Sequence, residues 1–239
     1  MTWIRRVGLV LLGVLAVLLG LYKLMNAWSF QVMGEIHNRV ETDEKVVALT
    51  FDDGPRPVIT EAILDILSRH QVKASFFMVG RRIEQNRALA ARVLAEGHEL
   101  GNHSYSHRRL ILKSTAYIEE EIAKTDALLR EAGVKGEIFF RAPFGKKLVG
   151  LPWVLSRQGR KHITFDVVPG DEATQDVDLL VSRVLESTRP GSIILLHDGG
   201  QEKPGTVKAT ERIIEALQAR GYRFVTVSEL LAARKAGHS

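Results

Sequence analysis

From Lys45 towards the C-terminus, short apolar runs alternate with longer stretches in which apolar residues recur at helical spacing. The runs predict about seven strands, each followed by a helix. Strands that alternate with helices build a parallel sheet covered by helices, because two parallel strands need a crossover connection between them. The sequence therefore predicts an α/β fold whose sheet is either closed into a barrel or open and doubly wound.

The expected elements follow from these runs. Strands are expected at residues 46–51, 74–79, 98–101, 137–140, 163–167, 192–196 and 224–227, and helices at 59–70, 87–96, 115–132, 152–159, 176–188 and 206–220. In either sheet arrangement, functional side chains are expected at the carboxyl ends of the strands.

The N-terminus carries an uncharged run at residues 7–22, preceded by Arg5 and Arg6 and followed by Lys23. At ~1.5 Å per residue the run spans about 24 Å, and Lys23 and a tryptophan at each end extend it to match a bilayer core. The exit from the run lacks a small-x-small cleavage pattern, which favours an anchor over a cleaved signal. Because the arginines precede the run, the N-terminus is expected in the cytoplasm and the remainder outside it.

Three parts are therefore expected: a membrane anchor at residues 1–28, a polar stem at 29–44 and one catalytic domain at 45–235. The absence of cysteine excludes disulfides and thiolate metal ligands, so any metal must be held by histidines and carboxylates. The net charge of +5 is scattered rather than gathered in a stripe, and nucleic acid is not an expected partner. The oligomeric state is left open.

Two chemical motifs follow the first and third expected strands. Asp52 and Asp53 come after the first strand, and His103 and His107 after the third. Alone, the acidic pair is more often a solvated turn, and the His pair is an even choice between metal ligands and structure. Two histidines four residues apart, on one face if they enter a helix, would make with one carboxylate a metal site with open positions for water and substrate.

Two further motifs follow later strands. Arg141 begins the run Arg-Ala-Pro-Phe-Gly and can reach back to a carboxylate, and His197 ends an apolar run and is a candidate general acid. Alone, each is more simply a surface arginine or a structural histidine. Because all four motifs lie at expected strand ends, together they predict a metallohydrolase site.

The chain resembles the polysaccharide deacetylases of carbohydrate esterase family 4, the chitooligosaccharide deacetylase (NodB-like) homology domain, over residues 45–231. The resemblance is carried by Thr-Phe-Asp-Asp-Gly, His-Ser-x-x-His, Arg-x-Pro-x-Gly and Leu-x-His-Asp. It implies a distorted (β/α) barrel of seven or eight strands. It also implies hydrolysis of N-acetyl groups on N-acetylglucosamine residues of an extracytoplasmic polysaccharide, such as peptidoglycan, a chitin-like polymer or an exopolysaccharide. The implied location is a bacterial inner or cell membrane, crossed once.

The resemblance also implies residue roles. It assigns a divalent metal, usually zinc with cobalt, nickel, iron or manganese as alternatives, to Asp53, His103 and His107. Among the catalytic residues, Asp52 would be the base that activates water. Arg141 would hold that base, and His197 would protonate the leaving amine.

Three further roles follow from the same motifs. Asp171 would tune the general acid, Leu195 would line the pocket for the acetyl methyl group, and the backbone N–H of Phe144 would bind the oxyanion. The fourth family segment departs from its usual form, with Val168 in place of an aspartate and Glu172 in place of a tryptophan. This change affects the groove wall and therefore the substrate.

Two other functions remain open at this point. One is a deformylase or deacylase of a lipid-linked aminosugar, which the anchor and the altered fourth segment favour. The other is an inactive, anchored glycan-binding module, which the intact set of motif residues argues against.

Overall fold

The computed structural model describes residues 3–200 and 203–234. Its central strand is β2 (Val46–Asp52), in which every residue is buried. Such burial is typical of a parallel strand covered on both faces. The strands β3 (Ser75–Met78) and β6 (Ile193–His197) pair with β2 on either side. β4 (Glu99–Asn102) continues the sheet beyond β3, and β7 (Arg223–Val225) pairs with the beginning of β2.

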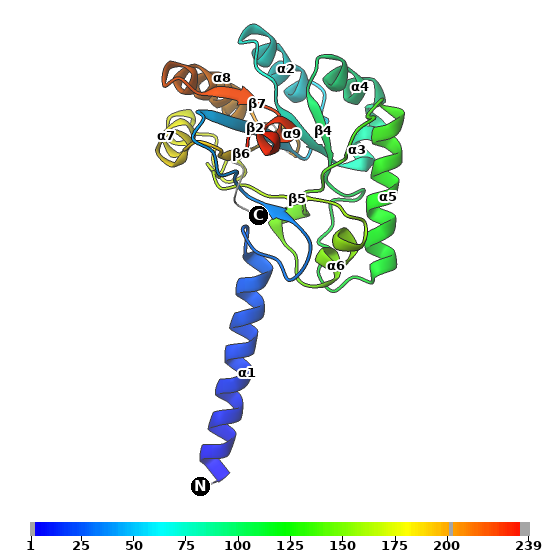
Figure 1. The fold of residues 1–239 in the computed structure, drawn as a ribbon, viewed down its shortest axis with the longest axis vertical. Coiled ribbons are helices and arrows are strands. Elements are labelled where there is room, and N and C mark those ends of the chain that lie inside the picture. The colour runs from blue at the N-terminus through cyan, green and yellow to red at the C-terminus, as the bar shows by residue number, and fades with distance from the viewer. Residues whose placement is uncertain (1–2, 201–202, 235–239) are drawn as a thin grey trace.

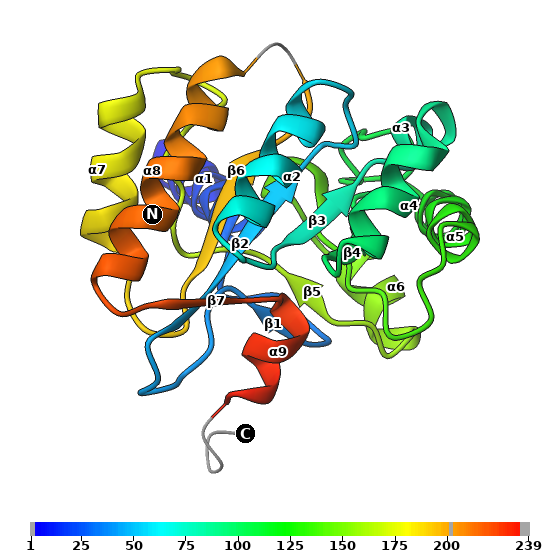
Figure 2. The ribbon, with the colours of Figure 1, turned by 90° about the horizontal axis from the view of Figure 1, so that it is seen from above.

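Helices surround this parallel sheet. Their bounds are α2 (Ile59–Arg69), α3 (Gly80–Gln85), α4 (Arg87–Ala95), α5 (Thr115–Glu131), α6 (Gly150–Arg157), α7 (Val177–Ser187), α8 (Pro204–Ala219) and α9 (Val227–Ala232). Seen from above, α7 and α8 lie on one side of the strands and α3, α4 and α5 on the other (Figure 2). The predicted α/β class is therefore confirmed.

Closure of the sheet into a barrel remains a prediction. A separate two-stranded sheet joins β1 (Ile36–His37) to β5 (His162–Ile163). Single bridges link Phe140 to both Asn102 and His162, and Val167 to Ile194. These bridges lie between the two sheets, but they are isolated contacts rather than continuous strands. The expected strand at 137–140 is reduced to its last residue, and that at 163–167 to its first residue and one bridge.

Short elements account for most other differences from the expected pattern. The helices α3 and α9 and the two-residue strand β1 are too short to show a period in the sequence. The last expected strand ends early because the Thr226 side chain accepts a hydrogen bond from the Glu229 backbone N–H and starts α9. A 3₁₀ turn, η1 (Pro143–Gly145), lies in the Arg141 motif.

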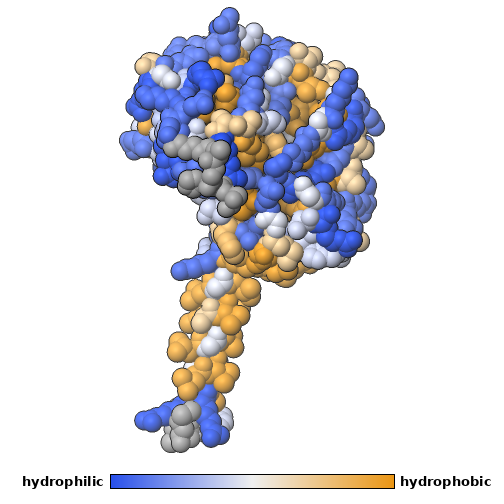
Figure 3. Space-filling model, viewed as in Figure 1, coloured by the Kyte–Doolittle hydropathy of each residue, from blue (hydrophilic) through white to orange (hydrophobic). Residues whose placement is uncertain are grey.

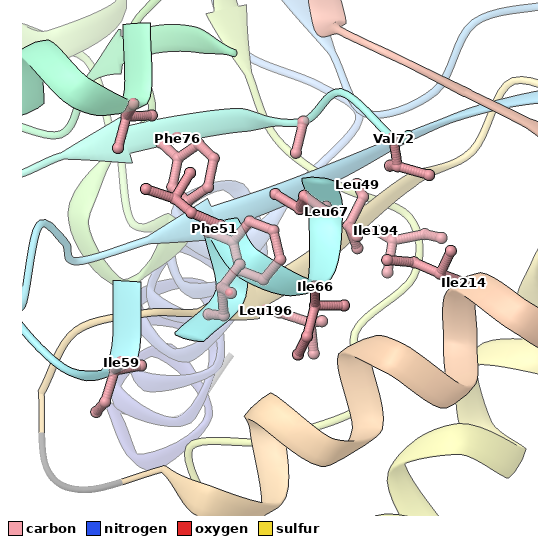
Figure 4. Packing of buried hydrophobic residues seen from close by; sticks show 14 of the residues in the cluster. Leu49, Phe51, Ile59, Ile66, Leu67, Val72, Phe76, Ile194, Leu196 and Ile214 are labelled. Atoms are coloured by element: carbon pink, nitrogen blue, oxygen red, sulfur yellow. The ribbon is translucent and has the colours of Figure 1, made fainter. Parts of the chain in front are cut away.

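The hydrophobic core lies between β2 and the helices that cover its outer face. Leu49 and Phe51 of β2 pack with Phe76 of β3 and Ile194 of β6 in one buried cluster, against α2 and α8 (Figure 4). Burial of such side chains contributes about 25 cal/mol per Å² of apolar surface. Burial of these apolar side chains therefore determines which face of each strand points outward, towards the helices.

The opposite face of the same strands carries the chemistry. Because side chains alternate along a strand, Thr50 and Asp52 point away from the Leu49 and Phe51 cluster. The same alternation places Leu195 in a second buried hydrophobic cluster on this opposite face, and His197 lies two residues further on. In the register of the sheet, Asp52 is the Cα partner of His197. Packing of the outer face therefore brings these two polar residues side by side.

The N-terminal helix α1 (Trp3–Asn26) projects from the domain (Figure 1). Its segment Arg5–Asn26 is long and apolar enough to cross a membrane, although a signal sequence has the same features. The following segment, predicted as a stem, runs along the domain. Gln31 and Val40 in it are buried, and His162 Nδ1 lies 2.9 Å from Gln31 Oε1.

Candidate functional site

Asp52 is the last residue of β2 and Asp53 is the next residue, and the two side chains contact different partners. Asp52 is 3% exposed, and Arg141 Nη1 donates to its Oδ1 at 2.6 Å. Asp53 adopts a left-handed backbone conformation, with φ of 76°, and its Oδ1 lies 2.9 Å from His107 Nε2 and 3.5 Å from His103 Nε2. The turn after the strand thus separates one carboxylate for the histidines from one held by arginine.

The two histidines lie in a loop after β4, not on a helix. Ser104 and His107 have φ of 60° and 57°, so the chain turns sharply between the ligand candidates. The Glu121 carboxylate accepts hydrogen bonds from the backbone N–H groups of Tyr105 and Ser106, which fixes this loop to α5. Loop geometry, rather than helical spacing, brings the two imidazoles to within 5.0 Å between ring centroids.

The tautomer of His103 fits a metal ligand. Its Nδ1 lies 2.9 Å from the Arg141 carbonyl oxygen, an acceptor, so Nδ1 carries the proton and Nε2 presents a lone pair. Asp53 Oδ1 is buried without a hydrogen-bond partner of good geometry, although both Nε2 atoms converge on it. Burial alone would raise the pKa of Asp53, and two protonated imidazoles beside it lower that pKa well below its usual range. With a lone pair on Nε2 instead, a bound cation would supply this positive charge.

These observations fit a divalent cation held by Asp53, His103 and His107. The three residues offer ligand atoms that lie within 4.8 Å of one another. One oxygen and two nitrogens suit zinc or another first-row ion and leave open positions. The resemblance pointed to the same three residues.

Arg141 is a completely buried cation surrounded by acceptors. It donates from Nη1 to Asp52 and to Thr50 Oγ1 (2.8 Å), and from Nη2 to the Thr164 carbonyl oxygen (3.1 Å). Its guanidinium carbon lies 3.9 Å from the centre of the Phe77 ring. Burial lowers the pKa of Arg141, while Asp52 opposes that shift. The arrangement fixes the orientation of the Asp52 carboxylate.

His197 is paired with Asp171 on the other side of the site. Asp171 Oδ1 lies 2.8 Å from His197 Nδ1, and Asp171 Oδ2 accepts from the His197 backbone N–H and from Thr206 Oγ1. Burial alone would lower the pKa of His197, but the hydrogen bond and charge of Asp171, with the charges of Asp52 and Asp53, raise it to about 9. A protonated imidazole therefore faces the cavity at neutral pH.

The turn after β2 is packed against Asp198. Asp198 Oδ2 accepts from Thr60 Oγ1 at 2.6 Å, and a side chain at Gly54 would collide with this carboxylate. Burial, with the charges of Asp53 and Asp52, raises the pKa of Asp198 to about 7. The missing side chain of Gly54 therefore allows the close packing that places Asp53.

All of the predicted site residues except buried Arg141 line one cavity of about 680 Å³. Leu195 forms part of its wall, and Phe144, with φ of 60°, lies with its ring 4.7 Å from that of His107. Val168 and Glu172 of the altered fourth segment also line it. Glu172 is exposed, and its Oε2 lies 3.9 Å from His197 Nδ1.

Three further residues of the cavity were missed from the sequence. Trp28 and Phe165 pack edge-on with ring centroids 5.0 Å apart, and Lys203 donates to the Asp171 carbonyl oxygen at 3.1 Å. Trp28 was expected at a membrane interface, and no motif linked it to the site. Phe165 lies three residues before Val168 of the altered fourth segment, and this closeness in sequence was the one available signal.

Sequence comparison relates the chain to deacetylases. The family model for polysaccharide deacetylase matches residues 39–163. A peptidoglycan-N-acetylglucosamine deacetylase of Bacillus cereus is 38% identical over 83% of this chain and 93% of its own length. A chitooligosaccharide deacetylase of a Bradyrhizobium species is 36% identical over 77% of this chain and 90% of its own length.

Solved structures show the same fold. The crystal structure of the Bc1960 peptidoglycan N-acetylglucosamine deacetylase has a TM-score of 0.78 at 34% identity, covering 83% of this chain and 93% of that one. A CE4 family pseudoenzyme from Bacillus anthracis has a TM-score of 0.77 at 28% identity, covering 85% of this chain and 70% of that one. Since a pseudoenzyme shares the fold, the fold alone does not establish catalysis, which depends on the site residues.

Proposed function

The chain belongs to the polysaccharide deacetylase family and is a polysaccharide N-deacetylase, and we propose that it is a metal-dependent one acting on N-acetylglucosamine residues outside the cytoplasm. The observation that carries this proposal is that two adjacent carboxylates contact different partners. Asp53 converges with two imidazoles, while Asp52 is held by Arg141 in the same site. One carboxylate is thus placed to bind a cation and the other to accept a proton.

Asp53, His103 and His107 would hold the cation. When bound, a divalent ion lowers the pKa of water from ~15.7 to about 7 and polarises a carbonyl oxygen. These three residues line the same cavity as Asp52 and His197, so an ion that they held would act on a substrate there.

The other residues would move protons and hold charge. Asp52 accepts the proton of the attacking water while the new C–O bond forms at the acyl carbon. The backbone N–H of Phe144 stabilises the oxyanion, and Leu195 contacts the acetyl methyl group. His197 donates its proton to the nitrogen as the C–N bond breaks, because an unprotonated amine is a poor leaving group. Acetate and a free amino sugar result.

The raised pKa of His197 predicts the alkaline limb of the pH profile. Because His197 must carry a proton, kcat is expected to fall as the pH rises through its pKa, which is about 9 without a bound cation and lower when a cation offsets the charge of Asp53. Asp171→Asn removes the charge that raises this pKa but keeps an acceptor oxygen, so the limb should move to lower pH. Profiles of kcat from pH 6 to pH 10 measure this shift.

Glu172→Gln is the matched control for this profile. Glu172 is exposed and lies 3.9 Å from His197 Nδ1, compared with 2.8 Å for Asp171. Its substitution should move the alkaline limb by less. An alkaline limb that is the same in Asp171→Asn and in the unmodified protein would contradict the assignment of His197 as general acid.

The anchor and location form part of the proposal. Contacts between the end of α1 and the domain support retention of the helix: Lys147 Nζ donates to the Ala27 carbonyl oxygen, and Thr164 Oγ1 donates to that of Trp28. With Arg5 and Arg6 at its cytoplasmic end, α1 would place the domain outside the cytoplasm. The proposed parts remain anchor 1–28, stem 29–44 and catalytic domain 45–235.

The substrate test measures acetate and formate released by the full-length, zinc-loaded protein. The panel contains chitooligosaccharides, peptidoglycan, poly-N-acetylglucosamine and a formylated aminosugar lipid. Acetate from a polymer would support the proposal and identify the glycan. Formate from the lipid would favour the second candidate, a lipid-linked aminosugar deformylase, which Val168 and Glu172 in the cavity wall support. Release of neither product would favour an inactive glycan-binding module.

A further inference from the structure

The junction between α1 and the domain carries an exposed apolar surface. Outside α1, nine large apolar side chains are exposed among the described residues, and six of them lie at this junction. These six, called the collar here, are each between 36% and 58% exposed: Trp28, Phe30, Val32, Met33, Phe144 and Val149. Apolar colouring continues from α1 onto the base of the domain (Figure 3). The collar thus extends the apolar surface of the helix.

The collar has two parts, residues 28–33 and residues 144–149, and contacts with the end of α1 hold them together. The Lys147 backbone N–H donates to the Met25 carbonyl oxygen at 3.3 Å, and Lys147 Nζ donates to the Ala27 carbonyl oxygen. Lys146 Nζ donates to Asn26 Oδ1. The loop between Phe144 and Val149 is therefore held on the last turn of the helix.

One wall of the catalytic cavity belongs to this junction. Trp28 lies two residues after the end of α1, and its ring packs on Phe165 inside the cavity that contains Asp52 and His197. Trp28 also lies only five residues after Lys23, the charge that ends the apolar run. If Lys23 lies among the headgroups, the cavity wall must lie at about the same depth.

Basic side chains accompany the collar. The Arg109 guanidinium carbon lies 5.1 Å from the centre of the Phe144 ring, and Lys146 is bound at the helix end. Tryptophan and cations beside exposed apolar side chains suit the interface of a bilayer with anionic lipids. The basic and the apolar side chains of this surface therefore both favour contact with a bilayer that contains anionic lipids.

We propose that the collar rests on the bilayer surface and holds the catalytic cavity there, so that the substrate is a polysaccharide of N-acetylglucosamine residues carried on a lipid anchor. This inference rests on the proposed deacetylation and on retention of α1. Enzyme and substrate in one bilayer meet at a high effective concentration, because both are confined to the same surface. The collar adds orientation, since it fixes which side of the domain faces the lipid.

Tryptophan fluorescence tests the contact without turnover. The chain has three tryptophans, so Trp3→Phe with Trp153→Phe leaves Trp28 as the single probe. The full-length protein is placed in phosphatidylethanolamine–phosphatidylglycerol vesicles that contain lipids brominated near the headgroup end of their chains. We expect strong quenching of Trp28 by these lipids and weak quenching by aqueous acrylamide.

The control probe lies on α7, away from the junction (Figure 1). Leu179 is 37% exposed, similar to the collar residues, and Leu179→Trp with all three native tryptophans replaced by phenylalanine reports that surface. It should be quenched by acrylamide and not by the brominated lipids. Equal behaviour of the two probes would overturn the proposed contact.

Turnover tests the substrate class. Phe30→Ser combined with Val32→Ser and Met33→Ser removes apolar contact outside the cavity. We expect about a tenfold loss of acetate release from an N-acetylglucosamine glycolipid in the same vesicles. Release from a soluble chitooligosaccharide should stay unchanged, as should both activities in Leu179→Ser. Equal effects on both substrates would overturn the inference. Absence of turnover with Trp28 still quenched would contradict the deacetylase proposal alone.

Discussion

Asp52→Asn is expected to lower kcat for acetate release by about 10²–10⁴-fold, the usual contribution of a general base. Asparagine keeps the size of the side chain and an acceptor oxygen for Arg141, which donates to Asp52 Oδ1 at 2.6 Å. It cannot accept the proton of water. Initial rates with saturating substrate measure the loss.

Metal content separates this effect from loss of the cation. Asp52 is not among the three proposed ligands, so Asp52→Asn should bind zinc in the same stoichiometry as the unmodified protein. Asp53→Asn is the matched comparison, since the neighbouring substitution should lower zinc affinity as well as activity. If Asp52→Asn kept more than a tenth of the original kcat, the assignment of Asp52 as base would be wrong.

Arg141→Met is expected to destabilise the domain by about 3–5 kcal/mol, the usual cost of breaking a buried ion pair. Methionine fills part of the space but leaves the Asp52 carboxylate, 3% exposed, without its cation. Thr50 also loses a hydrogen-bond donor. Urea unfolding of the metal-free protein at neutral pH measures the change, because bound metal would add its own stabilisation.

A double-mutant cycle isolates the pair. Asp52→Asn with Arg141→Met should lose less stability than the sum of the single variants, because each single change leaves one buried charge without its counter-charge. Arg212→Met is the matched surface control: Arg212 Nη1 lies 2.6 Å from Asp178 Oδ1, but both side chains are at least half exposed. Its loss should stay below about 1 kcal/mol. Additive losses in the cycle would contradict coupling between Asp52 and Arg141.

The parts of the fold that the sequence could predict are those with strong patterns. The strand at Val46–Asp52 is buried throughout, and its apolar run ends at the acidic pair. Both the position of this strand and the end that carries functional residues could therefore be predicted from the sequence. Helices of eleven residues or more, such as α5 and α8, also lie within a few residues of their expected bounds. Short elements such as α3 and β1 carry too few residues for a period to emerge.

Side-chain partnerships were harder to predict than element positions. Spacing suggested a helix for His103 and His107, but their proximity arises from left-handed turns that spacing does not encode. The pairing of Asp171 with His197 came from the resemblance and not from any local pattern. Trp28 reaches the cavity only because the chain folds back from α1 onto the domain, a contact between segments far apart in sequence.

Metal-dependent deacetylation is tested most directly by acetate release from the chitooligosaccharide and peptidoglycan substrates. One preparation of the full-length protein is assayed before chelation, after chelation and after zinc is restored. Its zinc content is determined at each stage. We expect about one zinc per chain, loss of both zinc and activity with chelator, and recovery of both together. His107→Gln should fail to recover zinc, because it removes one of the three proposed ligands. Full acetate release from protein shown to contain no metal would contradict the claim.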